Sequence, residues 1–441
     1  MFQIHFDQIS NNQFWLYNTI LLIGYSYLLL KFGRDFLSAL IITLFFYGMF
    51  SDIFGETGTK LYKITTLLWS FALFLYYPFV SFIKNHKTTS IILSITCILF
   101  VLISIIVHND NILLVLSQLS KLLIPFFIFS CLYNVIKNDN NDLYNFNLLF
   151  RYILISQIIF SFVKVLILGS FMEGWVGSLT GIRGGAIGTS LPLAGLCWFA
   201  LQKDMKEFNI NDILFIIGLL FIGFSTGKRA IWFLFPLLFI IFIFWVYRHN
   251  SRVFIYSAIF VIPMIYLGIR VSPTLNPDKK VWGNFDIKYA IEYALEYSRG
   301  EKDLNKGTKE GQGRIGAVKW MSNQISNGTT ITYAGLGNEY LTYMDSEDYF
   351  NSRYYFGIES KGSITYAVKI FMSCGIFILI SFIIYIISIL NLRNRYSYTL
   401  IFIVLFDCIF YQGCLFESTA LFVLVLFLNE AYNNILLYND N

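Results

Sequence analysis

The chain has 441 residues, of which 56% are hydrophobic and 13% are charged, and its formal net charge is +5. Because a soluble globular domain has roughly a quarter of its residues charged, this composition excludes an ordinary soluble protein, a disordered chain and a coiled coil. The class that remains is a polytopic integral membrane protein.

Apolar runs recur along most of the chain. A membrane-spanning helix needs roughly 17 to 25 mostly apolar residues, and several runs reach this length while others fall a little short. The sequence therefore predicts an all-α protein with about 12 or 13 transmembrane helices. The count depends on the run 415–428, which is either a further span or an interfacial helix. The other predicted spans are 15–30, 36–50, 64–83, 90–107, 112–136, 147–169, 184–201, 212–224, 231–247, 253–269, 364–391 and 398–414.

Positive charge in the connecting loops predicts the orientation of the chain. Numbered in chain order, the odd loops carry about eleven Lys and Arg and the even loops about five, and these residues are enriched on the cytoplasmic side. We therefore expect the N-terminus outside and the segment 270–363 on the extracytoplasmic face. The predicted domains are an N-terminal bundle of about ten helices at 1–269, an extracytoplasmic loop with short helices at 270–363, and C-terminal spans at 364–441.

The loop 270–363 is far longer than the other connections. Loops longer than about 15 residues are usually functional or disordered, and the many aromatic residues of this one favour order. We expect a helix over 285–300, with tyrosines spaced four apart on one stripe. A second helix is expected over 314–325. Its apolar face comprises Ile315, Val318, Met321 and Ile325.

The six cysteines lie in predicted spans or at their ends, and none lies in the loop 270–363. A disulfide framework for this loop is therefore excluded, and packing as small apolar side chains is the expected role of all six. The four histidines are scattered over different loops, so we expect no metal site and no cofactor.

Cations near one predicted membrane face are the most informative signal. On the predicted topology, Lys121, Lys164 and Lys369 lie in the outer parts of their helices. Arg183 and the pair Lys228–Arg229 lie in short outer loops, against the usual charge bias. Snorkelling of long side chains to lipid head groups is one interpretation. The other is a shared site for an anionic head group such as a lipid diphosphate, because a guanidinium presents paired donors to phosphate.

Aromatic residues of the long loop, including Trp282 and Trp320, offer a second kind of binding surface. Sugar rings pack their C–H faces on aromatic rings, so these side chains are suited to hold a saccharide. Packing inside the loop, or a place in the interfacial belt, is the alternative interpretation for each of them.

Four short motifs, in this order and spacing, resemble a known family. Their sequences are GIRGGAIGTSLPLAG at 181–195, STGKRA at 225–230, GRIGAVKW at 313–320 and AGLGNEYL at 334–341. With the long loop between late spans, they resemble the Wzy-type repeat-unit polymerases of O-antigen and capsular polysaccharide, in the O-antigen polymerase/ligase superfamily. The resemblance covers most of the chain and implies a GT-C-like fold in a bacterial cytoplasmic membrane, with the long loop outside.

The resemblance implies glycosyl transfer from a polyprenyl-diphosphate-linked oligosaccharide to a hydroxyl of the next lipid-linked repeat unit, without a metal. The expected partners are this lipid-linked substrate, membrane lipid, and a chain-length regulator and flippase of the same pathway, with no nucleic acid. Arg183, Arg229 and Arg314 are the expected cations that stabilise the leaving diphosphate, supported by Lys228 and Lys121. Glu339, beside the Gly-x-Gly turn, is the expected base. Substrate contacts are also expected from Glu359, Asp345 and Trp320.

Two other functions stay open. An O-antigen ligase of the same superfamily commonly has a His between the Gly-x-Gly turn and the next span, and the absence of His from 338–369 favours a polymerase. A flippase or transporter of lipid-linked oligosaccharide would explain the spans, but the chain shows no internal repeat, and transport alone does not explain a long ordered loop.

Overall fold

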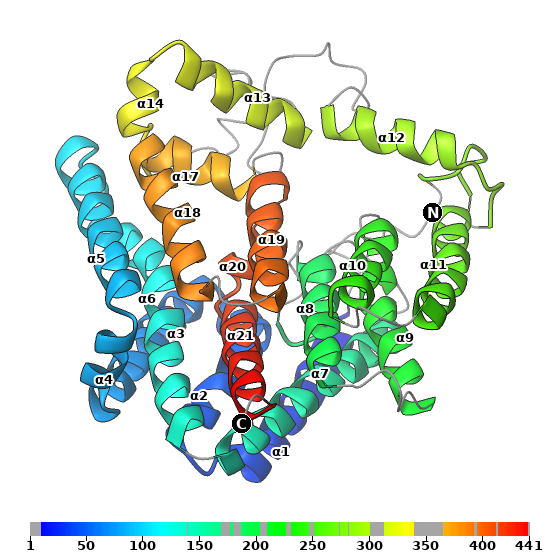
Figure 1. The fold of residues 1–441 in the computed structure, drawn as a ribbon, viewed down its shortest axis with the longest axis horizontal. Helices are drawn as coiled ribbons and strands as arrows, with labels where there is room; N and C mark the ends of the chain where they lie inside the picture. The colour runs from blue at the N-terminus through cyan, green and yellow to red at the C-terminus, as the bar shows by residue number, and fades with distance from the viewer. Residues whose placement is uncertain are drawn as a thin grey trace. The chain divides into compact units, whose positions relative to one another are not determined.

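A computed structural model shows the described residues folded almost entirely into helices (Figure 1). The described residues contain no β-strand, so the predicted all-α class is confirmed for this part of the chain. The structure describes residues 10–138, 140–168, 177–179, 187–202, 210–225, 231–246, 251–272, 274–280, 282–299, 313–338, 365–391, 395–411 and 413–439.

The helices divide into two compact units, each built from segments that are distant in the sequence. Unit 1 comprises residues 1–82, 123–268 and 418–441, and unit 2 comprises 83–122 and 269–417. The described part of the long loop thus belongs to the same unit as the helices that follow it. One unit boundary, at 268/269, lies within one residue of the predicted division at 269, whereas no boundary falls at 363, and 83–122 joins the long loop rather than the N-terminal helices.

Unit 1 contains eight whole helices of the described chain and most of α4 (Phe79–Asn85), α6 (Ile112–Asn138) and α11 (Ser251–Val271). The whole helices are α1 (Asn11–Phe32), α2 (Phe36–Phe45), α3 (Tyr47–Tyr76), α7 (Asn140–Leu168), α8 (Ile187–Gln202), α9 (Ile210–Ser225), α10 (Ile231–Val246) and α21 (Thr419–Asn439).

Unit 2 contains the helices of the long loop and those packed against them. They are α5 (Lys87–Val101) with its π-helical continuation η2 (Leu102–Val107), α12 (Ile287–Arg299), α13 (Gly313–Ser326), α14 (Thr330–Ala334), α17 (Tyr366–Cys374), α18 (Ile376–Leu390), α19 (Arg395–Phe410) and α20 (Cys414–Glu417).

Several helices are long and apolar enough to cross a membrane. Among the described residues there are three, or up to five if each of two sharply bent helix pairs is one span. Six shorter apolar helices accompany them. The three long ones cover Lys87–Val107, Ile112–Lys137 and Asn141–Ile167. The structure therefore supports a membrane protein.

Three predicted spans are interrupted rather than continuous. The predicted span 36–50 bends by 65° where α2 meets α3, and 64–83 bends by 87° between Leu61–Tyr76 and Phe79–Asn85. Pro78 lies at the second bend, where its ring and missing N–H do not fit a helix interior. The predicted span 364–391 is divided at Gly375, which has a φ of +82° and separates α17 from α18.

A buried polar turn, Gly177–Leu179, is held inside unit 1. The hydroxyl of Tyr17 donates to the carbonyl of Gly177 at 2.8 Å, and Gln157 bonds both the backbone and the hydroxyl of Ser178. The carbonyl of Ser178 in turn accepts from the backbone N–H of Gly48 at 2.9 Å. Because buried polar groups need partners, these bonds fix the turn between α1, α3 and α7.

Unit 2 is organised around two antiparallel helices, α5 with η2 and α18. The hydroxyl of Thr89 donates to the carbonyl of Ser388 near one end, and the hydroxyls of Thr96 and Ser381 bond near the middle. The hydroxyl of Ser104 lies 3.7 Å from the Cys374 sulfur at the other end. The end of η2 therefore lies beside the break between α17 and α18.

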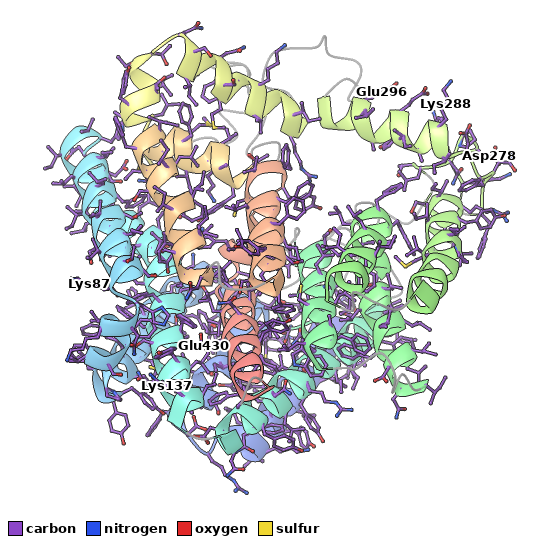
Figure 2. All side chains as sticks on the ribbon, in the orientation of Figure 1. Lys87, Lys137, Asp278, Lys288, Glu296 and Glu430 are labelled. Carbon is purple, nitrogen blue, oxygen red and sulfur yellow. The ribbon has the colours of Figure 1, made fainter. Side chains whose placement is uncertain are left out.

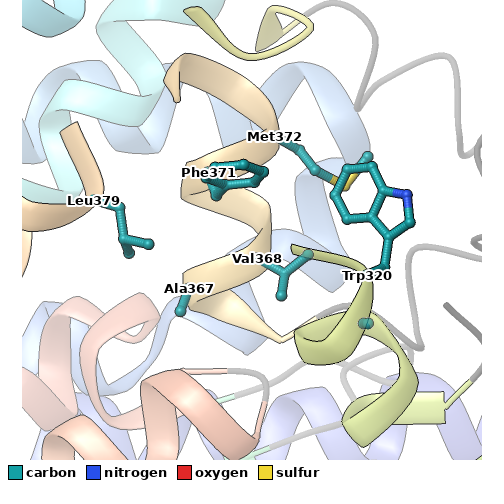
Figure 3. Packing of buried hydrophobic residues seen from close by; sticks show 7 residues of the cluster. Trp320, Ala367, Val368, Phe371, Met372 and Leu379 are labelled. Carbon is teal, nitrogen blue, oxygen red and sulfur yellow. The ribbon is translucent and has the colours of Figure 1, made fainter. Parts of the chain in front are cut away.

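The helices of the long loop form as predicted, but the buried face of α13 differs in part. Ala317 and Trp320 are its buried residues, and they pack on α17 with Val318 and Met321 (Figure 3). Ile315 and Ile325 are exposed, contrary to the predicted apolar face. Because α13 packs on α17, its buried face is rotated toward Trp320 relative to the predicted apolar face.

Helix α12 is amphipathic. It carries charges, of which Lys288 is exposed and Glu296 is half-buried (Figure 2), and it also exposes Ile287, Ile291 and Leu295. The rings of Tyr289 and Tyr293 stack with centroids 6.5 Å apart, as the four-residue spacing predicts. A helix with charges and an apolar face together is suited to a surface rather than to a lipid interior.

Candidate functional site

The π-helical end of α5 shapes the first wall of the candidate site. The backbone N–H of His108 bonds to the carbonyl of Ile103 at 3.1 Å, and that of Asp110 bonds to the carbonyl of Ser104 at 2.9 Å. Asn109 between them has a φ of +56°. These wide turns replace the regular α-helical pattern, and π-helical turns are frequent at functional sites. They leave His108 and Asp110 at the tip of the helix.

The Gly-x-Gly turn of the long loop docks on α17. The N–H of Leu336 donates to the carbonyl of Met372, and the N–H of Gly337 donates to that of Ser373 at 3.1 Å. A Cβ on Gly335 would lie 2.5 Å from the backbone nitrogen of Cys374, so only glycine fits this approach. The turn is therefore part of the packed structure of unit 2.

Side chains from the end of η2 hold both ends of this turn. Asn338 donates its backbone N–H and its side-chain Nδ2–H to the same carboxylate oxygen of Asp110, both at 2.9 Å. Its Nδ2 also donates to the Ser104 hydroxyl at 2.8 Å. At the other end, Nε2 of His108 lies 2.7 Å from the carbonyl of Ala334, and since a carbonyl only accepts, Nε2 carries the proton.

The sequence predicted none of these polar contacts. Asp110 and Asn338 are 6% and 3% exposed although both lie in segments that are polar in sequence. The two residues are 228 positions apart. The only sequence signal was the pair of glycines before Asn338, which indicated a close backbone approach without indicating its partner.

Arg314 lies at the start of α13 with its guanidinium over the ring of Tyr411, 4.0 Å from the centroid. The carbonyl of Tyr411 accepts from the N–H of Tyr366 at 3.1 Å, which ties the ring to the start of α17. Arg314 is half-buried, and among the described residues no carboxylate forms an ion pair with it. Stacking leaves the edge of the guanidinium, with its N–H donors, available for an anionic ligand.

Trp320 does not fit its predicted role as a sugar platform. The side chain is 4% exposed, and its ring meets Phe371 edge-on at a centroid distance of 6.1 Å. The ring lies inside the cluster of Figure 3, beside Met372. Its burial fixes α13, and hence Arg314, on α17.

Three lysines predicted near the outer face are described. Lys121 is half-buried on α6, and Lys369 on α17 holds its ammonium 5.8 Å from the ring centroid of Tyr366; both belong to unit 2. Lys164 belongs to unit 1, where it is 4% exposed with Asp52 as a charged neighbour. Lys164 is thus buried in protein, which contradicts snorkelling to head groups.

The other predicted site residues lie outside the described residues. They are Arg183, Lys228, Arg229, Glu339, Asp345 and Glu359. Glu339 directly follows Asn338 in the chain, so the docked turn ends one residue before it.

Metal ligands were not expected, and the part of the chain that the structure describes has no group of three His, Cys, Asp or Glu side chains arranged to hold a metal ion. Arg314 can bind an anion beside the start of α17, and Asp110 fixes a loop turn that docks at the end of α17, on Met372 and Ser373. No protein-family model matches the chain, and no curated protein matches it in sequence.

Proposed function

We propose that the chain is a polysaccharide polymerase that joins polyprenyl-diphosphate-linked repeat units by glycosyl transfer on the outer face of a bacterial cytoplasmic membrane. The observation that carries the proposal is the environment of Arg314. This cation of the long loop is half-buried, stacked on Tyr411, and free of carboxylate partners among the described residues. Such a guanidinium is suited to an anionic group such as a diphosphate.

The proposed reaction needs cations and a base. The acceptor hydroxyl attacks the anomeric carbon of the donor sugar, its proton passes to the base, and the bond to the lipid diphosphate breaks with the electron pair on the leaving oxygen. Arg314, Arg183 and Arg229 would stabilise the charge that develops there. Glu339 would accept the proton. Glu359 and Asp345 are the next candidates for this role.

Unit 2 supports a role for the long loop in bringing substrates together. Helix α13 packs on α17 and α19, and α14 packs on α17 and α18, so the loop that carries Arg314 is anchored on apolar helices. In the proposed architecture about 12 or 13 spans surround a GT-C-like site, and the described apolar helices support its membrane part. Holding a donor carbon and an acceptor hydroxyl together supplies proximity catalysis.

Purified protein in detergent tests the proposal. Given lipid-linked repeat units, the wild type should produce a ladder of longer chains without any transport step. Arg229→Ala and Arg183→Ala should leave single repeat units on the carrier at normal protein levels. Arg248→Ala, in a predicted cytoplasmic loop, is the matched control and should extend normally.

Two results would contradict the polymerase. Movement of lipid-linked units across vesicles without extension would identify a transporter. Transfer of a preformed chain to an acceptor other than a repeat unit would identify a ligase.

A further inference from the structure

The end of η2 contacts the long loop at the turn that directly precedes the proposed base in the chain. We define the latch as the segment Ser104–Asp110, which binds the turn Ala334–Asn338 through Ser104, His108 and Asp110. The residue after this turn is Glu339, the proposed base.

The turn needs an external anchor because of its composition. Gly335 and Gly337 have φ values of +74° and +91°, and glycine backbones lose more freedom on ordering than any other residue. The latch fixes both ends, with His108 at Ala334 and Asp110 at Asn338. Hydrogen bonds to a carboxylate are stronger than those between neutral groups, so Asp110 contributes the larger part of the anchor.

We propose that Asp110 is a positioning residue of the transfer reaction, which holds Asn338, the residue that precedes the proposed base Glu339 in the chain. This inference rests on the proposed function. Asp110 does not touch substrate in this scheme; it acts through the backbone and side chain of Asn338. A small displacement of the base is costly, since a misplacement of about 1 Å can slow a reaction about 100-fold.

Exchange of the two side chains tests this pairing. Asn338→Asp places two carboxylates in contact, and single-turnover extension should fall about 100-fold. The double variant Asp110→Asn with Asn338→Asp removes the second charge and leaves one amide and one carboxylate. Because one oxygen of Asp110 accepts both bonds in the wild type, the new amide must rotate so that its oxygen accepts from the backbone N–H and its nitrogen donates to the new carboxylate. Its rate should recover at least about tenfold over Asn338→Asp, as coupled neighbours do.

Donor binding separates positioning from general damage. Arg314, which is proposed to bind the diphosphate, keeps its own contact with Tyr411 in these variants. The affinity for the lipid-linked donor should therefore change less than about threefold while the extension rate falls. A parallel loss of affinity and rate would overturn the positioning role.

Cys374 provides a readout that does not depend on activity. Its side chain is 0% exposed, and its sulfur lies 3.7 Å from the Ser104 hydroxyl that binds Asn338. In a protein that keeps only this cysteine, N-ethylmaleimide should react slowly in the wild type, at least about tenfold faster in Asn338→Asp, and slowly again in the double variant.

The two readouts distinguish the possible failures. In one outcome, Cys374 is protected again in the double variant, but the wild-type protein never extends a repeat unit. This outcome would refute the polymerase and, with it, the role of the latch in catalysis. In another outcome, the wild type extends chains, but the double variant extends them as slowly as Asn338→Asp and its Cys374 is alkylated as fast. This outcome would refute the positioning role of Asp110 and leave the polymerase intact. Asn338→Ala, which keeps the backbone N–H, should retain more protection than Asn338→Asp.

Discussion

Gly335→Ala is the substitution whose effect the structure defines most completely. The backbone at this position has φ +74° and ψ −156°, a region that is essentially restricted to glycine, and a residue with a side chain is strained there by about 1–3 kcal/mol. The added Cβ would also lie 2.5 Å from the nitrogen of Cys374 and 2.6 Å from the carbonyl oxygen of Met372. Both are backbone atoms of α17 and cannot rotate away.

The turn must therefore separate from α17 or adopt a strained conformation. Separation breaks the bonds from Leu336 and Gly337 to α17, each of which contributes about 0.5–1.5 kcal/mol. The two bonds are lost on opening in the wild type as well, so only the strain of about 1–3 kcal/mol in the docked state shifts the equilibrium. This corresponds to about a 5- to 150-fold increase in the population of the open turn.

Alkylation of Cys374 measures this opening directly, in protein from which the other five cysteines have been removed. The matched control is Gly328→Ala in the same loop. Gly328 has a similar φ of +59°, but no atom lies within 4 Å of its Cβ position. Its local cost is about 1–2 kcal/mol, and alkylation of Cys374 should change less than about threefold because the docked turn is untouched.

Equal alkylation rates in the Gly335 and Gly328 variants would show that the turn does not need glycine to dock. The close approach to α17 would then be wrong, and the latch would lose its role. A Gly335 variant that is open but still extends chains normally would keep the docking and remove its importance for catalysis.

Three further predictions use other parts of the molecule. In a cysteine-free background, Asn305→Cys should react with an impermeant maleimide from outside, whereas His249→Cys should react only after permeabilisation; the reverse pattern would overturn the predicted orientation. Arg314→Ala should weaken binding of the lipid-linked donor by about 10- to 100-fold, and Arg314→Lys should restore little of it because an ammonium lacks the paired donors; unchanged affinity in a filter or quenching assay would exclude the diphosphate contact. His108→Gln should keep Cys374 protected, because its amide can still donate to the carbonyl of Ala334, whereas His108→Ala should expose it; equal protection in both variants would show that this bond is dispensable.

The helical class and most helix positions follow from local sequence patterns. In a membrane a long apolar run forms a helix, because every backbone group must be bonded within the segment. The predicted 112–136 lies within α6, and the predicted 147–169 follows α7 to its last residue, Leu168. In the long loop, side-chain spacing alone predicted α12 and α13, since residues three and four apart share a helix face.

The positions of breaks in helices depend on tertiary contacts, which the local sequence does not predict. The predicted span 364–391 is mostly apolar, yet it is divided at Gly375, where a Cβ would lie 2.4 Å from the carbonyl oxygen of Tyr333. The close approach of α14 decides this break. In the same way, α17 selects Trp320 rather than Ile315 as a buried residue of α13.

In the candidate site, too, the sequence predicted some features and only the tertiary structure shows the others. The motif around Arg314 indicated a cation at the start of a helix, because charge and spacing are written in the sequence itself. Its partner Tyr411 and the pairing of Asp110 with Asn338 appear only in the folded chain. An Asp in a short polar loop has the sequence pattern of a solvated surface residue, and only the packing of the long loop on η2 buries it. An apolar pattern is repeated many times along a helix, so it can be recognised in the sequence. A single hydrogen bond between distant residues produces no repeated pattern, so only the tertiary structure determines it.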